Sequence, residues 1–132
     1  PAKFYYELKP RQNRFENPDF AVLVVPDGSK PGDFEKDNEC LKNIYKLSIH
    51  AILKSDKINH ILFVRPKADG DAYVYGKMTR KLKKLYNGHG IDRERRLTLP
   101  VFCDADGIVW VPGFGVASAD ADKTVRVYYY YN

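Results

Sequence analysis

Apolar residues recur along the chain with the spacing of β-strands. Residues 3–9, KFYYELK, alternate and end before a proline, which predicts a short strand. Residues 20–26, FAVLVVP, form a continuous β-branched run typical of a buried strand. From Tyr45 to Leu53 every second residue is apolar, which predicts a long strand with one face in water. Shorter runs predict further strands at residues 60–66, 72–75, 100–103, 108–112 and 124–131.

Helical signals are confined to the middle of the chain. Thr79 suits a helix N-cap, and Asn87-Gly88 suits a C-terminus, so the segment between them predicts a helix. Its apolar side consists of Met78, Leu82, Leu85 and Tyr86, and its basic side of Lys77, Arg80, Lys83 and Lys84. Asp92 is placed to cap a second short helix that runs through Arg96. Residues 27–37, rich in Gly, Pro, Ser and charge, predict a loop.

Two glycine-containing stretches near the C-terminus predict turns. Residues 104–107, DADG, lie between two strand-like runs and predict a hairpin, because Asp and Gly tolerate the positive φ of tight turns. A calcium loop fits less well, since no downstream glutamate supplies the bidentate ligand. Residues 113–115, GFG, predict a chain reversal. Trp110 is expected to be buried against Met78, Leu82 and Leu85. Truncation to alanine would then lower the free energy of unfolding substantially.

Composition supports one sheet-rich domain over residues 1–132. The chain is 44% hydrophobic, and its ten tyrosines against one methionine favour pleated sheet over a helix bundle. Two cysteines are too few for a disulfide framework, and Cys103 is expected to be buried as a small hydrophobe. No apolar run is long enough to span a membrane. We therefore expect a cytoplasmic protein with no membrane partner.

Positive charge is concentrated in one segment. Residues 77–96 carry a net charge of +6, whereas the rest of the chain sums to −1. Such a local excess favours a polyanion partner. One interpretation is RNA binding by backbone contacts. The other is a protein-interaction module whose basic stripe faces water and whose Tyr-rich last strand pairs with a neighbouring domain or a second copy.

Catalytic and metal-binding patterns are absent from the sequence. His50, His60 and His89 belong to different predicted elements and have no spaced Cys or carboxylate partners, so a zinc site is not expected. No nucleophile elbow or phosphate-binding glycine loop occurs. We expect no catalytic residue, no metal and no cofactor in this chain.

One long segment resembles a known family. The run RPKADGDAYVYGKMTRKLKKLYNGHGIDRERRLTLPVFCDADGIVWVPGFGV, residues 65–116, is similar to the C-terminal domain of tRNA(Ile)-lysidine synthetase. The resemblance implies an α+β fold, a layered β-rich sandwich with short helices similar to a domain of the phenylalanyl-tRNA synthetase β subunit.

The resemblance also implies a function. Enzymes of this family join lysine to the wobble cytidine of tRNA(Ile) with ATP and Mg, and their chemistry belongs to an N-terminal domain with an S-G-G-x-D-S loop. That loop is not in this sequence. The chain is thus expected to be the appended part that contacts the acceptor-stem region of tRNA(Ile). The alternative is a stand-alone RNA-binding or protein-interaction module without enzymatic activity.

The expected RNA-binding residues combine the basic stripe with positions that match the family's motifs. They are Arg65, Lys67, Lys77, Arg80, Lys81, Lys83, Lys84, Arg93 and Arg96. Gly107, Trp110, Pro112 and Gly113 match the family's hairpin and are expected to be scaffold. Val74 and Ala117 stand where the family often has arginine.

Overall fold

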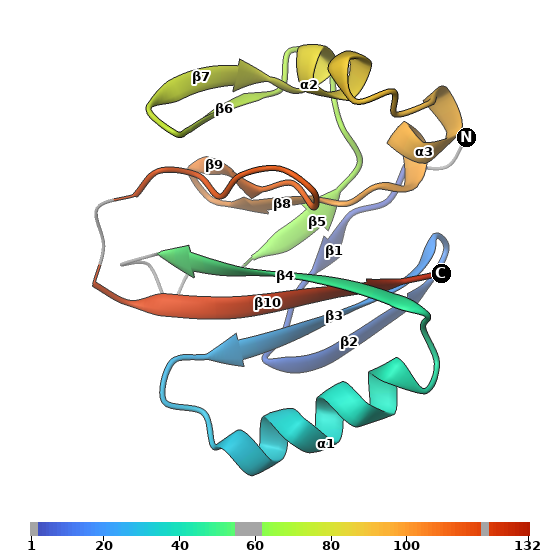
Figure 1. Cartoon of the computed structure of the whole chain (residues 1–132), viewed down its shortest axis with the longest axis vertical. Helices are drawn as coiled ribbons and strands as arrows, with labels where there is room; N and C mark the ends of the chain where they lie inside the picture. Colours follow the sequence, from blue (N-terminus) through green and yellow to red (C-terminus); the bar gives the residue numbers. More distant parts are fainter. Residues whose placement is uncertain (1–2, 55–61, 120–121) are drawn as a thin grey trace. The chain divides into compact units, whose positions relative to one another are not determined.

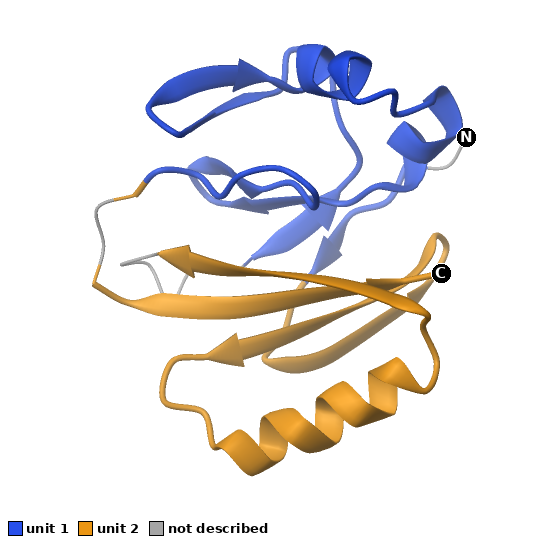
Figure 2. Ribbon diagram, in the orientation of Figure 1, with its two compact units in different colours: residues 1–7, 62–118 blue, residues 8–61, 119–132 orange. Residues whose placement is uncertain are grey.

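The apolar runs of the sequence become strands of two separate four-stranded antiparallel sheets (Figure 1). The computed structural model describes residues 3–54, 62–119 and 122–132. Two compact units each contain one of these sheets (Figure 2). Unit 1 comprises residues 1–7 and 62–118, and unit 2 comprises residues 8–61 and 119–132. The expectation of a single domain over residues 1–132 stays a prediction.

Unit 2 is built on the longer strands. Its sheet has the order β2-β3-β10-β4. The bounds are Arg11–Glu16 for β2, Asp19–Pro26 for β3, Leu47–Lys54 for β4 and Thr124–Tyr131 for β10. The strands predicted at residues 20–26, 45–53 and 124–131 are therefore confirmed. The β2–β3 hairpin turns at Asn17-Pro18, whose peptide bond is cis.

The C-terminal strand lies inside its sheet. β10 pairs with β3 along one edge and with β4 along the other. Because both of its edges are occupied, the expectation that this strand pairs with another domain or a second copy is wrong. Side chains do alternate as predicted: Tyr128 stacks with Tyr130 on one face, and Tyr129 stacks with Tyr131 on the other.

Helix α1, Pro31–Lys42, corrects the prediction of a loop over residues 27–37. Proline is favourable at the first helical positions, and Asp33 lies in the first turn, where a negative charge stabilises the helix. Only Asp37 and Leu41 are buried along the helix, so the segment has almost no apolar periodicity. Polar contacts also hold the helix against the sheet: the Tyr130 hydroxyl donates a 2.7 Å hydrogen bond to the side-chain oxygen of Asn38.

Unit 1 is built from shorter elements. Its sheet has the order β1-β5-β8-β9, and a separate hairpin is formed by β6 and β7. The bounds are Tyr6–Glu7 for β1, Phe63–Arg65 for β5, Ala72–Tyr75 for β6, Met78–Lys81 for β7, Leu82–Gly88 for α2, Arg93–Thr98 for α3, Val101–Asp104 for β8 and Gly107–Trp110 for β9. The result is the expected sheet-rich α+β architecture with short helices.

The β8–β9 hairpin confirms the turn predicted at residues 104–107. One carboxylate oxygen of Asp104 accepts hydrogen bonds from the backbone N–H groups of Asp106 and Gly107, at 2.8 and 3.2 Å. Trp110 is buried as predicted, with 2% of its surface exposed, and its ring lies 4.8 Å from that of Phe102. Met78, which was expected to cover Trp110, is 59% exposed and so is not part of the core.

Two further expectations concern burial and length. Cys103 lies in β8 and is buried, as predicted, and burial raises the pKa of its thiol to about 11. Within the described part of the chain, no helix has the length and apolar character needed to cross a membrane.

Candidate nucleic-acid interface

The basic segment begins as a β-hairpin, which corrects the helix predicted from Thr79. Gly76 and Lys77 both have positive φ, +60° and +67°, as in the two-residue turns that join tightly twisted strands. Thr79 pairs with Val74 across this hairpin and caps no helix. The glycine-containing pair between residues 72–75 and 78–81 is the hairpin signal that the helical reading missed.

Helix α2 starts at Leu82, five residues later than Lys77. Leu82 and Tyr86 are fully buried beneath it, whereas Lys83 and Lys84 are exposed. The helix ends at Gly88, as Asn87-Gly88 predicted, and the left-handed residue that follows it is Gly90 at φ +65°. The predicted stripe of Lys77, Arg80, Lys83 and Lys84 along one helix is thus wrong, because only the last two residues are helical.

Arg65 is held by the protein itself. Its guanidinium donates to both carboxylate oxygens of Asp71, at 2.8 and 3.0 Å, and to the carbonyl of Pro66. Asp71 also accepts a hydrogen bond from the Ala68 N–H, and its own carbonyl accepts one from the Leu82 N–H. This network fixes the loop that precedes β6 and the first residue of α2. The side chain expected to contact RNA therefore has a structural partner.

Arg80 and Arg96 are likewise engaged. The Arg80 guanidinium lies 4.7 Å from the centre of the Tyr75 ring. Arg96 donates to the carbonyl of Ile91 and to the side chain of Asn87, both at 2.7 Å, and so ties the end of α2 to α3. α3 itself starts as predicted, because the Asp92 side chain accepts a 2.7 Å hydrogen bond from the Arg95 N–H.

The other expected cations have no ion-pair partner among the described residues. Five of them are exposed and define what we call the exposed cationic surface: Lys77, Lys81, Lys83, Lys84 and Arg93. Lys67 is half-buried in the loop after β5. Unit 1 as a whole carries 11 Lys and Arg against 7 Asp and Glu. The surface thus retains uncompensated positive charge.

The hairpin that leads to this surface is anchored on its tyrosine-bearing side. The Tyr73 hydroxyl donates a 2.6 Å hydrogen bond to the carbonyl of Gly115, and the Ser118 N–H donates to the carbonyl of Val74 at 2.8 Å. The Tyr75 ring lies directly against Gly115, where a Cβ atom would collide with it. These contacts give Lys77 and Lys81 a defined position. The chain reversal predicted at residues 113–115 is confirmed by the Phe114 N–H bond to the Val111 carbonyl.

Groups with catalytic potential do not converge on the exposed cationic surface. His89 follows α2 and its ring packs edge-on against Phe114, whereas His50 lies in β4 of unit 2. His60 lies outside the described residues. Over residues 3–54, 62–119 and 122–132, no three His, Cys, Asp or Glu side chains are grouped as a metal site would need.

Sequence comparison places this geometry in a family. The sequence-family model described as "TilS substrate C-terminal domain" matches residues 62–129, just over half of the chain. The chain belongs to this family. The match starts with the long segment of unit 1 and ends in β10, so it includes the whole exposed cationic surface.

The TilS C-terminal fold extends over nearly the whole chain. A protein described as "Crystal structure of TILS C-terminal domain" superposes with a TM-score of 0.71 over 98% of each chain, at 22% sequence identity. The expected resemblance and fold are both confirmed. No curated protein matches the sequence significantly.

Proposed function

We propose that this TilS C-terminal domain binds tRNA through the exposed cationic surface, as a part of a tRNA(Ile)-lysidine synthetase. The parent enzyme would be an ATP-dependent ligase that joins lysine to the wobble cytidine of tRNA(Ile) in the cytoplasm. ATP, lysine and Mg would bind to the parent's catalytic domain. This chain would contribute affinity for the tRNA and selection of the correct tRNA, and it would contribute no catalytic group.

The observation that carries the proposal is the set of exposed cations that have no ion-pair partner among the described residues and that lie on a hairpin and helix held by hydrogen bonds within unit 1. Lys81, Lys83 and Lys84 lie within four consecutive positions at the end of β7 and the start of α2. Lys77 extends the set to the hairpin turn, and Arg93 to α3. Phosphates of an RNA duplex are contacted by such side chains without base readout, and contact releases counterions. We therefore propose the acceptor-stem region as the target.

Arg65 and Arg96 take a different role in this proposal. Each holds a loop next to α2 through hydrogen bonds within unit 1. We infer that they position the exposed lysines and contact RNA weakly or not at all. The alternative function, a protein-interaction module, loses support because β10 has no free edge.

Charge reversal of Lys83 and Lys84 tests the proposal. The double variant Lys83→Glu/Lys84→Glu should bind tRNA at least tenfold more weakly at low salt. The slope of log K against log salt should fall by up to about 0.9 for each lost phosphate contact. Filter binding across a salt series measures both quantities, and circular dichroism establishes that the variant is folded.

The matched control is Lys36→Glu/Lys42→Glu, which makes the same charge change on exposed residues of α1 in unit 2. It should lose far less affinity, through long-range charge alone. Equal losses in both double variants would show a non-specific charge effect, and unchanged affinity in Lys83→Glu/Lys84→Glu would rule out the exposed cationic surface.

A further inference from the structure

Three rings form a row on one face of the unit 2 sheet. Phe34 of α1 lies 5.0 Å from Tyr128 of β10, measured between ring centres. The ring centre of His50 in β4 lies 5.2 Å from that of Tyr128, with 26° between the ring planes. His50 is exposed and, among the described residues, stacks on no other ring. The row therefore ends in an imidazole that water can reach.

Helix α1 does not cover the β4 part of this face. Its buried Leu41 packs in a cluster with Tyr130 near the other end of β10. On β4, the residues that share the face are Ser48, His50, Ile52 and Lys54, and all four are exposed. Ile52, the one aliphatic residue of the four, is 49% exposed.

The charged side chains that β4 and β10 contribute to this face are both positive. Arg126 pairs in register with Ile52, and Lys54 with Thr124, which places both cations beside the ring row. Both are exposed and have no ion-pair partner in the described part of the chain. The residues that alternate onto this face along β4 and β10 include no Asp or Glu. A polyanion is thus favoured over an apolar protein partner, for which one half-exposed isoleucine is a small contact.

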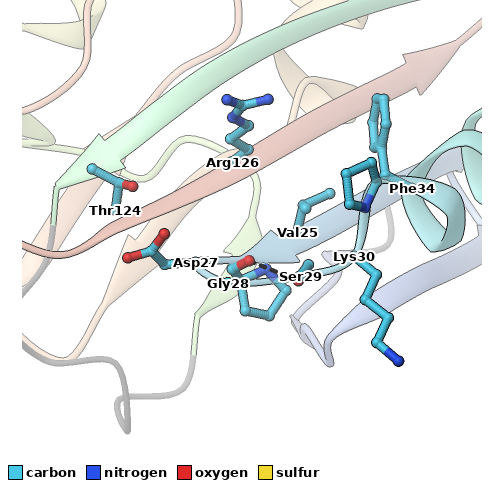
Figure 3. Close-up of a pocket in the computed structure, with 10 residues that line it drawn as sticks. Val25, Asp27, Gly28, Ser29, Lys30, Phe34, Thr124 and Arg126 are labelled. Carbon is cyan, nitrogen blue, oxygen red and sulfur yellow. Dashed lines mark hydrogen bonds between the residues drawn. The ribbon is translucent and has the colours of Figure 1, made fainter.

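A pocket of about 310 Å³ adjoins the row (Figure 3). Phe34, Val25, Thr124 and Arg126 line it together with the loop of residues 26–31, which contributes one acidic residue, Asp27, and one basic residue, Lys30. In Figure 3, Phe34 and Arg126 rise on the same side of the pocket, while the ammonium group of Lys30 points away from it. Its volume is at the lower limit of small-ligand sites, which is enough for one nucleoside.

We propose that this face binds unpaired nucleotides of an RNA. One base extends the ring row by stacking on His50, and the adjoining phosphates lie against Arg126 and Lys54. Stacking on aromatic rings combined with a basic backbone groove is the physical pattern of single-strand recognition. The proposal adds a second RNA contact, of a different kind from the duplex contact proposed for unit 1.

A short fluorescent single-stranded RNA of mixed sequence, titrated with the full 132-residue chain, tests the proposal by anisotropy. His50→Ala should weaken binding roughly tenfold, the effect of losing one base–ring stack. His50→Phe should retain most of the affinity because it keeps a ring. Arg126→Gln should weaken binding and reduce the salt slope by about 0.7. Lys36→Gln, on exposed α1, should change neither.

A short RNA duplex separates this proposal from the function proposed for unit 1. His50→Ala should leave duplex affinity unchanged, whereas Lys83→Glu/Lys84→Glu should lower it. Equal single-strand binding by wild type and His50→Ala, or none by wild type at low salt, would overturn the inference whatever the duplex result. Self-association lost in His50→Ala, seen by sedimentation without any change in RNA binding, would assign the face to a protein contact and also overturn it.

Discussion

The two units differ in how far acidic residues offset their positive charges. Unit 2 carries 11 Lys and Arg against 10 Asp and Glu, and its Arg11 forms a 2.7 Å ion pair with Asp37. Unit 1 carries 11 against 7, and its Arg65 forms a 2.8 Å ion pair with Asp71, while its exposed Lys83 and Lys84 have no ion-pair partner among the residues that the structure describes. Composition alone would rank the two units as equally rich in cations. The difference lies in the acids: with equal numbers of cations, unit 1 has three fewer Asp and Glu and therefore the larger net positive charge.

The units also differ in how their backbones are held. The β3, β4 and β10 strands of unit 2 are eight residues long and pair along most of that length. Strands of unit 1 have two to four residues. Unit 1 therefore depends more on a few large side chains and on hydrogen bonds at its turns. Four substitutions, ordered from the largest expected effect to the smallest, test this contrast.

Trp110→Ala should have the largest effect. A fully buried tryptophan that packs against Phe102 leaves a large cavity when truncated, so the free energy of unfolding should fall by about 3–5 kcal/mol. Urea denaturation followed by circular dichroism measures the change. Ile52→Ala in unit 2 is the control, and should shift stability by less than about 0.5 kcal/mol because the side chain is half-exposed. Similar losses in both variants would contradict the contrast.

Gly115→Ala should come next. The added methyl group collides with the Tyr75 ring, which is part of the anchored side of the β6–β7 hairpin. Overpacking of this kind costs about 1–3 kcal/mol. Gly28→Ala is a useful comparison, since that site is open but has a φ of +82°, so it reports strain without collision. A Gly115→Ala variant as stable as wild type would mean that the hairpin is free to move.

Asp37→Asn tests the ion pair of unit 2. The hydrogen bond from Arg11 lowers the pKa of the Asp37 carboxyl, so the ionised form stabilises the fold. That stabilisation is fully present above the pKa of Asp37 in the unfolded chain, about 4. It is lost as the pH falls through the lower pKa of Asp37 in the folded protein. Removing the charge should cost about 1 kcal/mol at pH 7 and less at pH 2. Thermal melts at several pH values would show the wild-type and variant curves converging in acid, and parallel curves would contradict the assignment.

Local signals account for the parts of the fold that the sequence predicted. The strand at residues 20–26, the hairpin at residues 104–107 and the cap at Asp92 each depend on neighbouring residues alone. Helix α1 was missed because Asp37, which anchors it, has its partner Arg11 26 residues away. The β6–β7 hairpin was mistaken for a helix because basic residues at Lys77, Arg80 and Lys84 happen to repeat at helical spacing.

The candidate site was predicted only as a set of cations. Sequence identified the basic segment, but the hydrogen bonds that Arg65 and Arg96 make within unit 1 could not be inferred from charge. The two hydrogen bonds between Arg65 and the Asp71 carboxylate depend on the conformation of the loop between them. The separation of free from engaged cations is a property of three-dimensional structure.

The two cysteines give the smallest and most direct contrast between the units. Cys40 of α1 is exposed, whereas Cys103 of β8 is buried, and its pKa is raised to about 11 by that burial. At pH 8 a thiol-specific reagent should therefore modify one cysteine per chain rapidly, and Cys40→Ser should abolish that phase. A raised thiol pKa also means that stability falls as pH rises above about 9, because the unfolded thiol ionises before the folded one. Two equally fast thiols in the native protein would show that β8 opens readily, which would contradict the buried packing that supports the exposed cationic surface.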